Sequence, residues 1–386
     1  MKVKIYHIWN IVLTIFFYIF RIFAIDSEKI VFTSYDGKGY GDNCKYIALE
    51  LKKIVPNAKM FWVLKKREKN DLPNWIHPVR LGSIKYVYEM ATAKVWVDNS
   101  RKSEYIVKRK GQYYIQTWHG GLGLKLCEGD TLEPLPESWI RRSKHDSSMI
   151  DVMISNSRYC TEMYQRAFWY TGKIEEYGSP RCDVLTSISE NDKKRVRENL
   201  KIDDNTFIVL YAPTFRSTSE DVFDIDVDRV INEIEEREGK KVRFLIRMHP
   251  LADLSKYEIG NNKNILDVTS YSDVYELLAV TNMLITDYSS LMMEAMFAKI
   301  EVQLYAKDLQ SYIKERGFHF QLDELPILLG TSNDEFIRNL RMFDASKYLK
   351  HLEGFSDRVG LKESGEASKK VAYLIREQVK EKKHKS

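Results

Sequence analysis

Short apolar runs alternate with longer amphipathic segments along the first half of the chain. Five apolar runs bounded by polar turns predict β-strands, and the apolar residues between them have helical spacing. Because the runs are continuous in Val, Ile and Phe, they indicate parallel strands covered by helices on both faces. The predicted strands are 29–35, 59–64, 94–98, 112–117 and 151–155, and the predicted helices are 43–54 and 84–91.

The same pattern repeats in the second half of the chain. A chain of 386 residues is longer than one hydrophobic core usually organises. We therefore predict an α/β fold of two Rossmann-like domains facing a cleft, residues 26–185 and residues 186–386 with closing C-terminal helices. The second domain has predicted strands at 206–211, 242–248, 264–268, 283–286 and 301–305, and predicted helices at 226–239, 272–280, 290–298, 333–342 and 364–382.

The N-terminus departs from this pattern. Residues 8–20 form an apolar run of 13 residues, which is roughly 20 Å of helix and too short for a hydrocarbon core of about 30 Å. No small-residue cleavage site follows, so we do not expect a cleaved signal peptide. We predict that residues 1–25 form an apolar helix lying in or dipping into the inner leaflet of a membrane, with a buried packing helix and a true membrane span as alternatives. The basic tail at 380–386 suits either anionic lipid headgroups or a solvated chain end.

Composition narrows the classes of function. Lys and Arg number 60 against 55 Asp and Glu, so a net charge of +5 gives no argument for nucleic acid as a partner. The four cysteines form no Cys-x-x-Cys pair and have no zinc-like spacing to histidine, which is typical of a reducing compartment. The chain has no P-loop and no H-E-x-x-H or G-x-S-x-G motif. We therefore predict no metal and no cofactor.

Two histidines directly follow predicted strands. His119 comes after strand 112–117 with Gly120 and Gly121 behind it, which suits a general base facing a ligand. A histidine whose hydrogen bonds are satisfied in a turn is the alternative. His249 follows strand 242–248 in the same way, and Pro250 fixes its direction while Arg247 precedes it by two residues.

Polar groups also gather where other predicted strands end. Asp287, Ser289 and Ser290 lie between strand 283–286 and a helix, where exposed N–H groups favour a phosphate, although Ser and Asp are also ordinary helix caps. Thr214 and Arg216 follow strand 206–211. Because Arg pairs with phosphate oxygens in a fork geometry, Arg216 is a candidate phosphate ligand. Arg316 is a further cation after the last strand.

The loop after the first strand is rich in glycine. Residues 34–42 contain Gly37 and Lys38 and lead to Asp42 and Asn43, but the spacing is not G-x-G-x-x-G. A dinucleotide site is therefore disfavoured, and close approach of an acceptor or a phosphate fits better.

Seven motifs together resemble one family. From about residue 28 to residue 325 the chain is similar to the CDP-glycerol:glycerophosphate glycerophosphotransferase family, the teichoic-acid primases and polymerases. The motifs that carry the resemblance are D-N-x-K-Y-I (42–47), QTWHG (116–120), G-x-P-R-x-D (178–183), YAPTFR (211–216), R-x-H-P (247–250), TDYSS (286–290) and RGF (316–318).

The resemblance implies a GT-B-like fold in which the second domain binds the nucleotide. It implies that His119 is the catalytic base and that His249 steadies the donor pyrophosphate. The implied donor and phosphate ligands are Thr214, Arg216, Arg247, Asp287, Ser289, Ser290 and Arg316. The implied acceptor-side residues are Gly37, Lys38, Asp42, Asn43, Gly120, Gly121 and Lys125.

The resemblance also implies the reaction. Glycerol phosphate or ribitol phosphate would pass from its CDP derivative to a hydroxyl of a lipid-linked glycan or polyol-phosphate polymer, releasing CMP, in teichoic-acid or capsule-like polymer synthesis. The expected location is the cytoplasmic face of a bacterial membrane with an anionic surface, as a peripheral or monotopic protein. The family commonly continues QTWHGTPLK, whereas this chain has QTWHGGLGLK and keeps Lys125, which leaves the acceptor and the polyol open. A nucleotide-sugar glycosyltransferase and a non-catalytic membrane scaffold are the alternatives.

Overall fold

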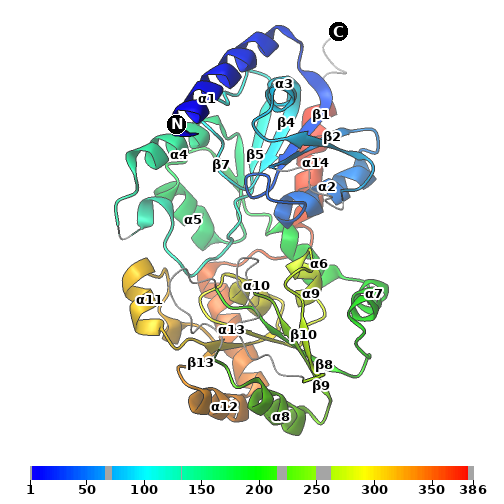
Figure 1. The fold of residues 1–386 in the computed structure, drawn as a ribbon, viewed down its shortest axis with the longest axis vertical. Helices are drawn as coiled ribbons and strands as arrows, with labels where there is room; N and C mark the ends of the chain where they lie inside the picture. The colour runs from blue at the N-terminus through cyan, green and yellow to red at the C-terminus, as the bar shows by residue number, and fades with distance from the viewer. Residues whose placement is uncertain (1, 66–71, 132, 215–223, 249–261, 381–386) are drawn as a thin grey trace. The chain divides into compact units, whose positions relative to one another are not determined.

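The computed structural model describes most of the chain, as two compact units that are considered separately (Figure 1). The first unit comprises Met1–Gly121, Cys127–Asp183 and Lys362–Ser386, and the second comprises Leu122–Leu126 and Val184–Leu361. The described residues are 2–65, 72–131, 133–214, 224–248 and 262–380.

The first unit is built on a parallel sheet of seven strands. Its order is β3-β2-β1-β4-β5-β6-β7, so β1 and β4 lie near the centre. The strands are β1 (Asp26–Thr33), β2 (Lys59–Leu64), β3 (Ile76–Arg80), β4 (Ala93–Asp98), β5 (Tyr113–Gln116), β6 (Val152–Ile154) and β7 (Lys173–Glu175). The helices are α1 (Lys2–Ile19), η1 (Phe20–Ile22), α2 (Asp42–Ile54), α3 (Ile84–Thr92), η2 (Glu128–Asp130), α4 (Glu137–Met149), α5 (Arg158–Ala167), η3 (Pro180–Cys182) and α14 (Ala367–Lys380).

Helices cover both faces of this sheet. Ile30 and Phe32 of β1 share one buried cluster with α2 and with Val371 and Ile375 of α14. On β4, the side chain of Trp96 points to the opposite face from those of its neighbours, and its Nε1 donates to the Met90 carbonyl of α3 at 3.0 Å. The predicted parallel, doubly covered sheet is confirmed in this unit.

The C-terminal helix differs from the prediction in its placement. We expected helix 364–382 to close the second domain, whereas α14 packs against α2 in the first unit. Its apolar stripe supplies Val371, Ala372 and Ile375 to the core around β1. Helical periodicity predicts that such a stripe is buried, but it does not say which sheet buries it.

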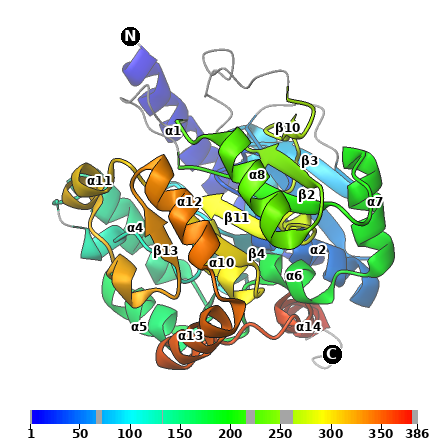
Figure 2. The same ribbon diagram turned by 90° about the horizontal axis from the view of Figure 1, so that it is seen from below.

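The second unit contains a parallel sheet of six strands in the order β10-β9-β8-β11-β12-β13. Helices α8 and α12 lie side by side against it (Figures 1 and 2). Its strands are β8 (Phe207–Tyr211), β9 (Val242–Ile246), β10 (Ile265–Asp267), β11 (Met283–Thr286), β12 (Glu301–Tyr305) and β13 (Leu328–Gly330). Its helices are α7 (Glu190–Leu200), α8 (Val227–Glu238), α9 (Val274–Leu278), α10 (Leu291–Phe297), α11 (Leu309–Arg316), η5 (Leu322–Glu324), α12 (Asn333–Met342) and α13 (Ala345–Val359), and α6 (Asp183–Ser187) lies where the chain passes from one unit to the other.

The N-terminal helix α1 has two apolar faces. Leu13 and Phe17 are buried, and the adjoining Phe20 ring contacts Tyr88 of α3 edge-on at 5.3 Å. Ile11 and Ile15 point away from this contact and are 53% and 54% exposed. Among the described residues, no helix combines the length and the apolar character needed to cross a membrane.

Candidate active site

His119 lies in a sharp turn after β5. Trp118 adopts a left-handed backbone conformation with φ 52°, and its N–H donates to the side chain of Gln116 at 2.9 Å. Such a conformation is rare for a bulky residue and marks a position that the surrounding structure enforces. The turn places the His119 ring against the Trp118 ring, with 4.4 Å between their centroids.

The His119 ring is held in one tautomer. Its Nδ1 lies 2.5 Å from the carbonyl oxygen of Asn99. Because a carbonyl only accepts hydrogen bonds, Nδ1 carries the proton and Nε2 carries the lone pair of the neutral ring. Burial lowers the pKa of His119 below its ordinary value of 6.5, although the bond to Asn99 opposes the shift. The imidazole is therefore a neutral base near pH 7.

A buried ion pair between Arg181 and Asp42 stabilises the turn that contains His119. Arg181 Nη1 donates to Asp42 Oδ2 at 2.6 Å and to the carbonyl of His119 at 2.7 Å. Arg181 is 1% exposed and Asp42 is 5% exposed. Burial on its own would raise the pKa of Asp42, but the Arg181 charge and the bond from Asn99 outweigh it and hold that pKa below its ordinary value.

Asn43 forms hydrogen bonds to two other motifs, the segment around Trp118 and the segment around Arg181. Its Nδ2 donates to the Trp118 carbonyl at 3.0 Å, and its Oδ1 accepts from the Arg181 N–H at 3.1 Å. The segments around residues 42, 118 and 181 therefore meet at one point. Asp42 and Asn43, which we expected on the acceptor side, are buried and position the His119 turn.

His119 and Lys38 line a cavity of about 360 Å³ within the first unit. Arg101 and Arg142 also line it, and Arg101 is paired with Glu128 at 3.1 Å. Sequence reasoning missed these two arginines and Asn99. Asn99 directly follows β4, so its place at the end of a buried strand could have marked it as a candidate site residue. No sequence motif marks either arginine.

Two of the predicted glycines lie in close contact with other parts of the protein. A Cβ atom on Gly37, whose φ is 81°, would lie 2.9 Å from the backbone nitrogen of Lys65. A Cβ atom on Gly121 would lie 2.6 Å from the side-chain nitrogen of Asn156. A Cβ on Gly120 would meet only the Trp118 ring, at 4.0 Å. The Thr that the family commonly has after QTWHG would not fit at position 121 with Asn156 in this place.

In the second unit, the ends of β8 and β11 bring two predicted residues together. The N–H of Thr214 donates to Asp287 Oδ1 at 2.8 Å, and the N–H of Tyr288 donates to the same oxygen at 2.5 Å. Ser289 and Ser290 precede α10, and Ser289 Oγ accepts from the Leu291 N–H at 3.3 Å. Asp287 therefore organises the loop that presents the two serines.

Arg247 and Lys125 occupy structural positions in the same unit. Arg247 Nη1 donates to the carbonyls of Val268 and Tyr271 at 3.1 and 2.6 Å, and burial lowers its pKa. Lys125 forms an antiparallel bridge with Phe318, and its Nζ lies 5.4 Å from the centre of the Tyr312 ring.

The remaining predicted residues cannot be placed. His249 and Arg216 lie outside the described residues, and so does the side chain of Arg316 at the end of α11. Among the residues that are described, no group of three His, Cys, Asp or Glu side chains is arranged to hold a metal ion.

The sequence from residue 15 to residue 377 matches the family model of CDP-Glycerol:Poly(glycerophosphate) glycerophosphotransferase. The chain belongs to this family. A member from Staphylococcus epidermidis, a teichoic acid poly(glycerol phosphate) polymerase, is 33% identical over 380 residues, which cover 92% of this chain and 52% of the relative. This chain thus spans about half the length of that relative.

In two further comparisons, the matched region covers almost the full length of both proteins. A teichoic acid poly(glycerol phosphate) polymerase from Bacillus spizizenii is 29% identical over 94% of this chain and 96% of its own length. A structure of the wall teichoic acid polymerase TagF superposes with a TM-score of 0.86 at 30% identity, covering 99% of this chain and 98% of that one. The glycerophosphotransferase family and its α/β fold with parallel sheets are thus established for this chain.

Proposed function

We propose that this glycerophosphotransferase moves a polyol phosphate from its CDP derivative to a hydroxyl of a polymeric acceptor and releases CMP. The observation that carries the proposal is the fixed, neutral imidazole of His119 at a cavity, with its Nε2 lone pair available. Both relatives above are named for poly(glycerol phosphate), so glycerol phosphate is the transferred group that we propose first, and ribitol phosphate second.

In the proposed step, His119 Nε2 takes the proton of the acceptor hydroxyl. The acceptor oxygen attacks the phosphorus distal to cytidine, a phosphodiester bond forms, and the phosphoanhydride bond to CMP breaks. Phosphoryl transfer requires mainly alignment and charge compensation from a protein. We propose that Thr214, Ser289 and Ser290 supply hydrogen bonds to the donor phosphates.

Other donor contacts follow from the family resemblance. His249, Arg216 and Arg316 remain proposed ligands of the donor phosphates. For Arg247 we propose a positioning role instead, because its guanidinium already holds the backbone at Val268 and Tyr271.

We also propose that the enzyme works at the cytoplasmic face of the membrane, on a lipid-linked acceptor. The exposed apolar side chains of α1 and η1, which include Ile11 and Ile15 of α1 and Ile22 of η1, support attachment to the inner leaflet. A helix that lies in the interface needs an apolar face on the lipid side only, and the other face of α1 packs on α3.

Side-by-side assays of donors test the function. Purified enzyme with a membrane-linked glycerol-phosphate primer is offered CDP-glycerol, CDP-ribitol and UDP-sugars, and products are identified by mass spectrometry. We expect added polyol-phosphate units and equimolar CMP. Transfer of a sugar from a UDP-sugar would favour a glycosyltransferase, and a failure to consume any donor would favour a non-catalytic scaffold.

A further inference from the structure

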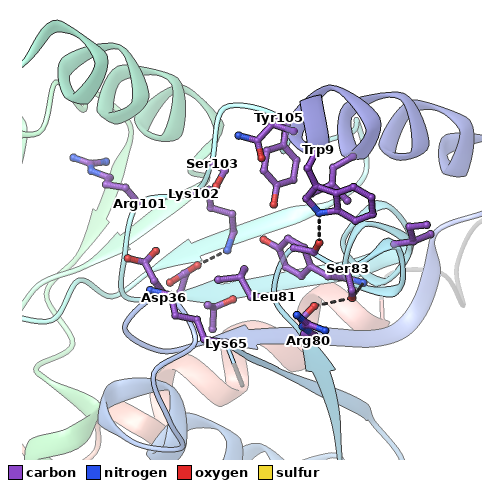
Figure 3. A pocket seen from close by; sticks show the side chains of 17 residues that line it. Trp9, Asp36, Lys65, Arg80, Leu81, Ser83, Arg101, Lys102, Ser103 and Tyr105 are labelled. Atoms are coloured by element: carbon purple, nitrogen blue, oxygen red, sulfur yellow. Dashed lines mark hydrogen bonds and ion pairs between the residues drawn. The ribbon is translucent and has the colours of Figure 1, made fainter. Parts of the chain in front are cut away.

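A second cavity, of about 640 Å³, adjoins the His119 cavity in the first unit (Figure 3). The two cavities share Asp36 and Arg101 as lining residues. Thr33, Arg80 and Asp98 line the second cavity and are the last residues of β1, β3 and β4. Its position at the carboxyl ends of parallel strands is where ligands bind in α/β folds.

The charges that line this cavity are only partly compensated. Four basic side chains, Lys65, Arg80, Arg101 and Lys102, face two acidic ones, Asp36 and Asp98. Lys102 is paired with Asp98, Arg101 with Glu128 and Asp146, and Asp36 with Arg142. The side chains of Lys65 and Arg80 have no ion-pair partner among the described residues. Within the described part of the chain, these two positive charges are left uncompensated and could pair with an anion.

A buried hydroxyl in the same cavity has no hydrogen-bond partner among the residues that the structure describes. Thr33 is 4% exposed and lines the cavity, and its Oγ1 forms no hydrogen bond within the described part of the chain. Leaving a buried hydroxyl unpaired costs about 1–3 kcal/mol, so native proteins rarely do it without a bound molecule or water. The hydroxyl adds a hydrogen-bond donor to the cavity that Lys65 and Arg80 also line.

The N-terminal helix forms the opposite wall of the cavity. Trp9 Nε1 donates to the Gly82 carbonyl at 2.9 Å, which fixes α1 to the turn between β3 and α3. Figure 3 shows Trp9 and Tyr105 on one side of the cavity, and Lys65 and Arg80 on the other. The cavity thus combines an apolar wall with two exposed cations on the other side, which fits a phosphate attached to a carbon chain.

We propose that this cavity binds the phosphate-bearing part of the acceptor, next to the polyol whose hydroxyl reaches His119. Lys65 and Arg80 pair with the phosphate ester, Thr33 donates to one of its oxygens, and the wall formed by Trp9 contacts the carbon chain. This inference rests on the proposed function, because it assumes that the neighbouring cavity holds the reacting hydroxyl. The phosphate belongs either to the polymer itself or to its lipid anchor.

Acceptor kinetics of the double variant Lys65→Gln/Arg80→Gln test the proposal. Three acceptors are compared: a glycerol-phosphate oligomer on an alkyl phosphate anchor, the same oligomer without the anchor, and an uncharged alkyl glycoside ending in glycerol. We expect the KM for the anchored oligomer to rise about tenfold or more, because charged hydrogen bonds to the phosphate are lost. The KM for the donor and the KM for the uncharged acceptor stay unchanged.

A matched control variant shows whether the effect is specific to this cavity. The variant Lys53→Gln/Arg195→Gln removes two exposed cations elsewhere and should leave every KM unchanged. A rise for both oligomers assigns the phosphate to the polymer, and a rise for the anchored oligomer alone assigns it to the anchor. An unchanged KM for the anchored oligomer, or an equal rise for the uncharged acceptor, overturns the proposal.

Direct titration of the unanchored and anchored oligomers by calorimetry separates this inference from the proposed function. If the wild type binds an oligomer and the double variant binds it at least tenfold more weakly, the cavity is an acceptor site even where no donor is turned over. Weaker binding by the double variant together with no turnover of any donor would reject the proposed reaction but keep the cavity as an acceptor-binding site. If the wild type and the double variant bind both oligomers with equal affinity, the cavity is not the acceptor site, whatever the turnover.

Discussion

At the scale of single residues, the tautomer and pKa of His119 decide its chemistry. The bond from Nδ1 to Asn99 leaves Nε2 as the basic atom, and burial favours the neutral ring. A general base works best when it is neutral and accepts a proton at a defined atom. The site therefore suits proton abstraction at neutral pH.

A pH profile of kcat/KM for the acceptor checks this reading. Because the pKa of His119 lies below 6.5 and the neutral ring is the active form, activity should be constant above that pKa and fall tenfold per pH unit below it. We expect the acidic midpoint below pH 6.5. An acidic midpoint above pH 7 would contradict a buried neutral imidazole.

The Asp42–Arg181 pair gives a second prediction at this scale. Asp42→Asn leaves the Arg181 guanidinium buried without its counter-charge, which typically costs 3–5 kcal/mol. We expect urea denaturation to show a loss of about this size, together with reduced turnover. The double variant Asp42→Asn/Arg181→Met should recover part of the lost stability. A single-variant loss below about 1 kcal/mol would show that the pair does not support the His119 turn.

At the scale of helices and strands, long buried runs were predictable and the edge strands β3, β7 and β13 were not, although the short edge strand β10 falls within the predicted strand 264–268. The predicted strands 59–64, 283–286 and 301–305 coincide with β2, β11 and β12. β3 contains Pro78, which is tolerated there because β3 is an edge strand, and β7 and β13 are three-residue edge strands. Such segments lack the length and apolar content that periodicity needs, so only the folded sheet reveals them.

Helix α1 provides the prediction at this scale. Ile11→Ser/Ile15→Ser removes two side chains from its exposed apolar face, so binding to vesicles containing phosphatidylglycerol should weaken about tenfold or more. Because neither side chain is buried, the melting temperature should not change. Vesicle cosedimentation measures the affinity.

Met342→Ser/Leu349→Ser is the matched control for this measurement. It removes two exposed apolar side chains from α12 and α13, and it should bind vesicles as the wild type does. If the α1 variant and this control bind equally well, α1 is not the membrane-binding element.

At the scale of the whole molecule, the sequence indicated the site through motifs and missed what holds them together. His119, Thr214 and Asp287 follow strands that the hydrophobic pattern predicts, so their places at strand ends were foreseeable. The supporting network depends on contacts between distant segments, because Asn99 and Asp42 are 57 positions apart and Arg181 and Asp42 are 139 positions apart. No local pattern encodes such contacts.

Transfer of glycerol phosphate by a His119 variant shows whether His119 is the catalytic base. His119→Ala is compared with His77→Ala, which removes an exposed imidazole from β3, in transfer of labelled glycerol phosphate from CDP-glycerol to a membrane-linked primer. Loss of a positioned base lowers turnover by roughly 10²–10⁴-fold. We expect His119→Ala to lose this much while melting like the wild type, and His77→Ala to lose nothing. Turnover by a folded His119→Ala enzyme within a few-fold of the wild-type rate would contradict the assignment of His119 as the base.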